Sequence, residues 1–148
     1  MHSGDSGDRG QAVITLYLRP AVLVASAAGL AVAAYLTFVH FSAAQLVCTV
    51  GGAINCERVL GSGYAVIAGT GVPTSALGIV WFAVAGALAL ARRRRAQAVW
   101  SIAGLLTVVY LVFIEIVQLG AICIWCTAAH VLVLVIFLLT VTVPEPES

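Results

Sequence analysis

Four apolar runs, each about long enough to cross a lipid bilayer, constrain what this chain can fold into. A helix rises 1.5 Å per residue, so about 20 residues span the roughly 30 Å of hydrocarbon. The four runs cover residues 16–41, 72–91, 96–119 and 124–143. Within each run, apolar residues occupy all sides of the expected helix rather than one stripe, and glycine and alanine are frequent, as in helices that pack closely in lipid. We therefore predict an all-α integral membrane protein, a bundle of four transmembrane helices.

Composition agrees with a membrane protein and excludes a polyanionic partner. The chain is 62% hydrophobic and 9% charged, with a mean hydropathy of +1.11, well above the apolar content of soluble domains. Its formal net charge is only +1, and much of the positive charge lies in one block of four arginines, Arg92 to Arg95. We do not expect this protein to bind nucleic acid.

The arginines predict how the bundle is oriented. Arg92–Arg95 lie between the second and third runs, and Arg9 and Arg19 lie near the start of the first, so the positive-inside rule puts both regions in the cytoplasm. The expected parts are a polar cytoplasmic N-terminus at 1–15, a membrane domain at 16–143 and a cytoplasmic tail at 144–148. Within the domain, 92–95 form a cytoplasmic turn and 42–71 an outer loop.

This orientation places all four cysteines, Cys48, Cys56, Cys123 and Cys126, on the outer side. The outer face of a bacterial plasma membrane, or a secretory lumen, is where disulfides form and persist. Four cysteines allow three pairings, and the sequence does not choose among them.

The spacing of the last two cysteines, in "CIWC" at 123–126, favours a reactive pair. A disulfide across two residues closes almost no loop and stabilises little. At the start of a helix, free backbone N–H groups and the helix dipole favour a thiolate, the species that attacks disulfides. The outer loop repeats the arrangement in "NCERVLGSG", where Asn55 is a candidate N-cap for a short helix that begins at Cys56.

Two other readings of the cysteines stay open. Four thiolates could hold zinc, although structural zinc usually takes two close pairs or added histidines, and we predict no metal. The cysteines could also serve only as structural disulfides in a non-catalytic membrane protein with four spans.

The chain contains a C-x7-C loop pair ("CTVGGAINC"), a serine six residues later (Ser62), and CIWC at the start of the last span. Taken together, these motifs resemble the vitamin K epoxide reductase family. The resemblance covers nearly the whole chain after residue 16. It implies a bundle that holds a quinone (menaquinone, ubiquinone or a vitamin K-like quinone) near its outer end. Bacterial members of the family resemble substitutes for the disulfide-forming oxidase of the periplasm.

The resemblance also implies a role for each cysteine. Cys48 exchanges with a thioredoxin-fold (DsbA-like) partner outside the membrane, Cys56 relays electrons to Cys123, and Cys126 reduces the quinone. Ser62 steadies the loop. Because the sequence stops at Ser148, we expect the partner to be a separate protein.

Several polar and aromatic residues are candidates for the quinone pocket. His130 stands one helical turn after Cys126 and could bond a quinone carbonyl, deliver a proton, or be satisfied by a neighbouring helix. Thr74 and Ser75 offer hydroxyls at similar depth or act as helix caps. Trp125 is expected to anchor at the headgroups or to stack on the quinone. For Glu115, a carboxylate at the membrane–water interface is favoured over a part in a proton path.

The expected function is oxidation of thiols in exported proteins at the bacterial plasma membrane, coupled to quinone reduction. The runner-up is reduction of a quinone epoxide by the same thiols. The tyrosine that we associate with the position of His130 in vertebrate members is missing here, which argues against epoxide chemistry.

Overall fold

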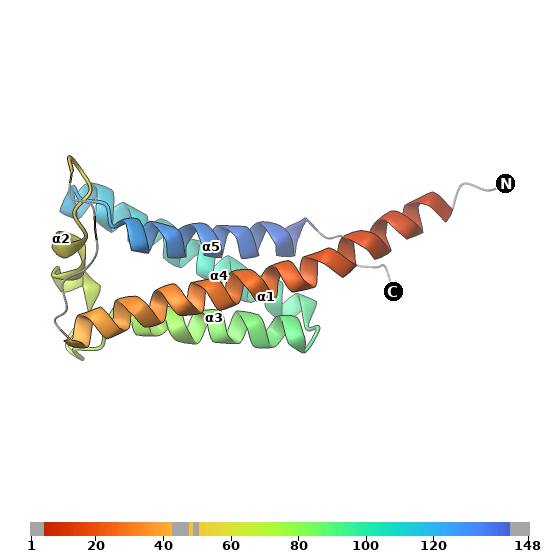
Figure 1. Cartoon of the computed structure of the whole chain (residues 1–148), viewed down its shortest axis with the longest axis horizontal. Coiled ribbons are helices and arrows are strands. Elements are labelled where there is room, and N and C mark those ends of the chain that lie inside the picture. The colour runs from red at the N-terminus through yellow and green to blue at the C-terminus, as the bar shows by residue number, and fades with distance from the viewer. Residues whose placement is uncertain (1–4, 43–47, 49–50, 143–148) are drawn as a thin grey trace.

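The computed structural model describes residues 5–42, 48 and 51–142. These residues form four long helices that lie side by side, and Figure 1 shows α1 extending past the end of the others. The helices are α1 (Asp5–Ser42), α3 (Thr74–Leu90), α4 (Arg94–Phe113) and α5 (Ile124–Val141). Between α1 and α3 lie the short helix α2 (Cys56–Leu60) and a 3-10 turn, η1 (Gly63–Ala65). A π-helix, η2 (Ile114–Leu119), continues α4 without a break.

The helices follow the predicted runs closely, with differences at their ends. The first helix begins at Asp5, well before the predicted start at residue 16. The second begins at Thr74, because Pro73 supplies its N-cap residue. Arg94 already belongs to α4, so the turn predicted at 92–95 is shorter, and Arg92 takes a left-handed conformation in it (φ 56°). Val143 and the predicted tail at 144–148 lie outside the described residues.

Three helical segments are long and apolar enough to cross a membrane: Leu16–Ser42, Arg94–Leu119 and Ile124–Val141. The helix α3 is equally apolar in character but has only 17 residues. The described residues therefore form an all-helical protein with three helical segments of the membrane-spanning type. The predicted count of four spans stays a prediction.

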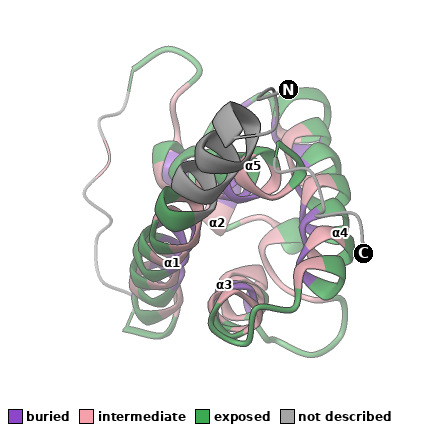
Figure 2. Cartoon of the chain, turned by 90° about the vertical axis from the view of Figure 1, so that its right-hand side faces the viewer, coloured by how far each residue is buried: buried purple, intermediate pink, exposed green. Residues whose placement is uncertain are grey.

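Polar and apolar residues are arranged as in a protein that faces lipid. Large apolar side chains such as Phe38, Val99 and Leu106 are more than 60% exposed, whereas Gln97 and Ser101 are buried inside the bundle. Figure 2 shows buried residues on the inward faces of the helices and exposed residues around the outside. A soluble protein of this size would rarely leave so much apolar surface in water.

Small residues let the helices approach one another closely. A Cβ atom on Gly29 of α1 would overlap the ring of Phe82 on α3, and one on Gly78 would lie 3.3 Å from the Cβ of Ala33. Phe82 belongs to a core that also includes Val108 of α4 and Ile136 of α5. This small-residue packing is typical of membrane helices, which gain van der Waals contact rather than hydrophobic burial when they associate.

Both cysteine pairs lie at one end of the bundle. Figure 1 shows α2 and the start of α5 at this end, and the turn between α3 and α4 with its arginines at the other. The chain thus separates its thiols from its densest block of positive charge by the length of the helices.

Candidate redox site

The four cysteines divide into one oxidised and one reduced pair. Cys48 and Cys56 form a disulfide with their Cα atoms 6.3 Å apart, while Cys123 and Cys126 are free thiols. Cys56 and Cys123 are both 0% exposed and belong to one buried cluster, against which Cys48 and Cys126 also pack. The structure therefore selects one of the three possible pairings and brings both pairs into contact with the same cluster.

Backbone hydrogen bonds fix the two pairs next to each other. The Asn55 amide donates to the carbonyl of Ile122 (3.1 Å), and the Ile122 amide donates to the carbonyl of Ala53 (2.8 Å). Ile54 and Ile122 form an isolated parallel bridge. Because Asn55 and Ile122 directly precede Cys56 and Cys123, this pairing sets the positions of the two buried sulfurs.

The helix that carries Cys56 begins as its sequence predicts. The Asn55 side-chain oxygen accepts the Arg58 amide at 2.9 Å, which satisfies one of the free N–H groups of the first turn. The Gly61 amide closes the helix by donating to the Glu57 carbonyl at 2.8 Å. Cys56 therefore occupies the first position of a capped helix.

Cys123 is the N-cap residue of α5, one position earlier than the predicted first turn. Its sulfur accepts the Cys126 amide at 3.3 Å, and its carbonyl accepts the amide and hydroxyl of Thr127 at 2.8 and 2.9 Å. The hydrogen bond from the Cys126 thiol is the largest of the effects that lower the pKa of Cys123, and it outweighs the burial that opposes it. Cys123 is thus prepared to carry a thiolate.

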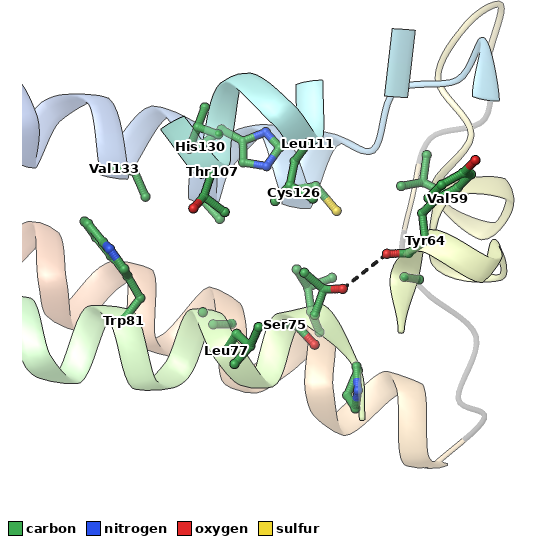
Figure 3. Close-up of a pocket in the computed structure, with 18 of the residues that line it drawn as sticks. Val59, Tyr64, Ser75, Leu77, Trp81, Thr107, Leu111, Cys126, His130 and Val133 are labelled. Atoms are coloured by element: carbon green, nitrogen blue, oxygen red, sulfur yellow. Dashed lines mark hydrogen bonds between the residues drawn. The ribbon is translucent and has the colours of Figure 1, made fainter. Parts of the chain in front are cut away.

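A cavity of about 360 Å³ lies beside the CxxC pair and is lined by residues of α1, α3, α4 and α5. In Figure 3, Cys126 and His130 point into it from α5, and Leu77 and Trp81 face them from α3. Its lining is overwhelmingly apolar, and its volume is within the range of small-molecule pockets. Leu77 and Thr107 are exposed lining residues, so the cavity opens between α3 and α4.

Four of the five residues predicted for the quinone pocket line this cavity. They are Ser62, Thr74, Ser75 and His130. The Ser62 hydroxyl donates to the carbonyl of Val59 at the end of α2 (2.7 Å). The Thr74 hydroxyl donates to the carbonyl of Tyr64 (3.2 Å), which ties the segment after α2 to α3. The Ser75 hydroxyl accepts from Thr37 of α1 at 2.9 Å. All three hydroxyls thus have structural bonds in addition to their place at the cavity.

The fifth residue, Trp125, is not among the lining residues. Its ring packs against Tyr35 of α1, with ring centroids 4.9 Å apart, and it belongs to the surroundings of the cysteine cluster. Trp125 thus faces α1, whereas Cys126 lines the cavity.

Among the candidate residues, Glu115 lies farthest from its expected position, which was the membrane–water interface. It is only 6% exposed and lines the cavity, and its Oε2 accepts the Cys123 amide at 3.4 Å. The buried face of α4 runs through Gln97, Ser101, Gly104 and Val108. Glu115 continues this face seven residues after Val108, a periodicity that predicts an inward position.

The cavity suits a quinone. Quinones have an apolar ring with two carbonyl acceptors, and the largely apolar lining includes the imidazole of His130 as a possible donor. Within the described ranges, no three His, Cys, Asp or Glu side chains gather as metal ligands would.

Comparison with protein families places the chain in a known family. The model of the vitamin K epoxide reductase family matches residues 20–141, which is most of the chain. No curated protein matches. The matched region includes both cysteine pairs and all the cavity residues named above. The chain therefore belongs to the vitamin K epoxide reductase family, membrane thiol oxidoreductases linked to a quinone or vitamin K.

Proposed function

We propose that this protein oxidises a separate thioredoxin-fold protein outside the bacterial plasma membrane and passes the electrons to a membrane quinone. One observation carries the proposal. The oxidised Cys48–Cys56 pair and the reduced Cys123 and Cys126 pack on one buried cluster, and Cys126 also lines an apolar cavity.

The proposed topology has four spans, with both termini in the cytoplasm. At 1.5 Å per residue, the 17 residues of α3 extend about 25 Å, and the bilayer can thin slightly to match a short span. The arginine turn would then face the cytoplasm, and α2 would form part of an outer loop with both cysteine pairs.

Electrons would enter at Cys48. A partner thiolate must reach a disulfide sulfur, and Cys48 is partly exposed whereas Cys56 is fully buried. Attack on Cys48 forms a mixed disulfide and releases Cys56 as a thiolate. A second partner thiol then completes the exchange, which leaves the partner oxidised and Cys48 and Cys56 reduced.

Transfer to the CxxC pair would be a short step inside the cluster. The Cys56 thiolate attacks Cys123 of an oxidised CxxC pair and releases Cys126, and Cys48 then displaces Cys123 to re-form the loop disulfide. The products are an oxidised loop pair and a reduced CxxC pair, the redox state that this structure has. The fixed neighbouring positions give the exchange a high effective concentration.

The reduced CxxC pair would deliver its electrons in the cavity. A bound quinone accepts two electrons and two protons, and the two thiols lose the same number as they form a disulfide. Cys126 lines the cavity and is the cysteine expected to react there. His130, one turn deeper, would donate a hydrogen bond that holds the ring.

The test is quinone reduction by the purified protein in detergent, without oxygen and with a reduced thioredoxin-fold partner as the electron donor. Quinone absorbance monitors the reaction. Quinone should be reduced in step with partner oxidation, and Cys126→Ala should be inactive. A matched variant, Cys48→Ala, should lose oxidation of the partner but keep quinone reduction when a small dithiol is the donor. A wild-type protein that oxidises no partner with any quinone would contradict the proposal, and turnover only with a quinone epoxide would favour the epoxide reductase.

A further inference from the structure

The buried carboxyl of Glu115 has no role in the electron path described above. It lies in the π-helix η2, near the end of the bundle that holds the cysteines. Such π-helical turns are rare and occur often at functional sites. Gly120 ends this one in a left-handed conformation (φ 57°), and the Gly120 and Ala121 amides bond to the Glu115 carbonyl. The backbone around Glu115 is therefore specifically shaped.

Among the residues that the structure describes, the surroundings of Glu115 contain the reactive thiols and no ion-pair partner. Its carboxylate accepts the Cys123 amide and interacts electrostatically with both Cys123 and Cys126. On α2, which packs against η2, the charged residues Glu57 and Arg58 are exposed to solvent. On α5, His130 lines the same cavity. No salt bridge of Glu115 occurs among the described residues.

A buried acid beside two thiols restricts how much negative charge the site can hold. Two anions a few ångströms apart in a medium of low dielectric constant repel strongly, so one ionises at the expense of the other. A proton that leaves a CxxC thiol therefore has a nearby acceptor in the Glu115 carboxylate. This transfer forms a thiolate without adding a second negative charge to the site.

We propose that Glu115 is the proton carrier of the CxxC pair: its carboxylate takes a proton from the dithiol and passes it into the cavity. The inference rests on the proposed quinone reduction. When Cys123 and Cys126 form their disulfide, they lose two electrons and two protons, and the quinone gains both. Glu115 touches Cys123 on one side and the cavity on the other, so it connects the place where a proton is released with the place where one is consumed.

The test combines two measurements on Glu115→Gln, a variant that keeps an oxygen to accept the Cys123 amide. General acid–base catalysis typically contributes about 10²–10⁴-fold, so quinone reduction should slow by about 100-fold. Alkylation of the CxxC thiols, measured without quinone by the mass of the peptide that holds both, should move to lower pH, because the repelling carboxylate is gone. A purely structural role would not make the thiols more reactive while it makes the enzyme slower.

Two further variants serve as controls. Glu115→Asp keeps a carboxyl and should recover much of the lost turnover. Glu57→Gln removes the exposed carboxylate beside Cys56 and should change neither measurement, because water and salt screen that charge.

The outcomes separate a failure of the proposed role of Glu115 from a failure of the proposed quinone reduction. If wild-type protein reduces quinone and Glu115→Gln does so equally fast, or if its alkylation curve coincides with that of the wild type, Glu115 is not the proton carrier. If wild-type protein reduces no quinone, the proposed function fails first, whatever the alkylation curves show, and this inference fails with it.

Discussion

Replacement of Gly104 by alanine should damage the cavity through Trp81. A Cβ atom at Gly104 would overlap the Cζ2 atom of Trp81 and lie 2.6 Å from its Cε2 and 2.9 Å from its Nε1. The indole cannot retreat easily, because it stacks on Trp100 with ring centroids 6.4 Å apart and meets the edge of Phe82 at 5.1 Å. The Trp100 indole also donates to the Trp81 carbonyl at 3.1 Å.

The expected cost follows from comparison with another helical glycine. A Cβ atom at Gly86 would lie 3.5 Å from the Cβ of Ser26, an ordinary contact. Both substitutions gain about 1 kcal/mol in helix propensity, whereas overpacking costs about 1–3 kcal/mol only at Gly104. Gly104→Ala should therefore be less stable than Gly86→Ala by about 1–3 kcal/mol.

Chemical unfolding of both variants in the same detergent measures this difference, and quinone titration measures the cavity. Gly104→Ala should also require a higher quinone concentration for half-maximal turnover, because Gly104 and Trp81 both line the cavity and a displaced indole changes its shape. Equal stabilities within about 0.5 kcal/mol, with unchanged quinone dependence, would refute the reasoning that Trp81 is held in place by its aromatic neighbours.

Two further predictions concern the helix starts that carry the cysteines. Asn55→Ala should lower the free energy of unfolding by about 1 kcal/mol, the usual value of an N-cap, while Asn55→Asp keeps the capping oxygen and should stay within a few tenths of wild type in denaturant titration. Cys126→Ala removes the hydrogen bond that lowers the pKa of Cys123. The pKa should rise, so the midpoint of Cys123 alkylation should move to higher pH, and an unchanged midpoint would show that the helix start alone sets it.

Local patterns in the sequence were enough to predict the helices and one cap. Long apolar runs indicate membrane-type helices because backbone groups in lipid must bond within their own segment. The Asn55 cap depends only on residues within one turn, so "NCERVLG" specifies it. The exact helix ends were less predictable, as at Arg94, because several residues can extend or end a turn at similar cost.

Directions of side chains inside the bundle were harder to predict. Trp125 and Cys126 are neighbours in the sequence, yet only Cys126 lines the cavity, because the Trp125 ring packs against Tyr35 of α1. Glu115 was expected at the interface because a carboxylate in an apolar helix is usually placed near water. Its burial depends on the face that α4 turns toward α5 and on the π-helix, and only the periodic row through Gly104 and Val108 hints at it.

The contact between the two cysteine pairs depends on segments that are far apart in the chain. The Cys48–Cys56 disulfide closes the loop segment between these two cysteines, and residues 53–55 also bond to Ile122, a contact that the sequence did not predict. These bonds do not involve a cysteine, so they can persist when the loop disulfide is reduced. Cys56 would then stay beside Cys123 through the exchange, and Cys48 is the sulfur that must change partners. The partner protein therefore needs access to only one cysteine, and it is the one that this fold leaves partly exposed.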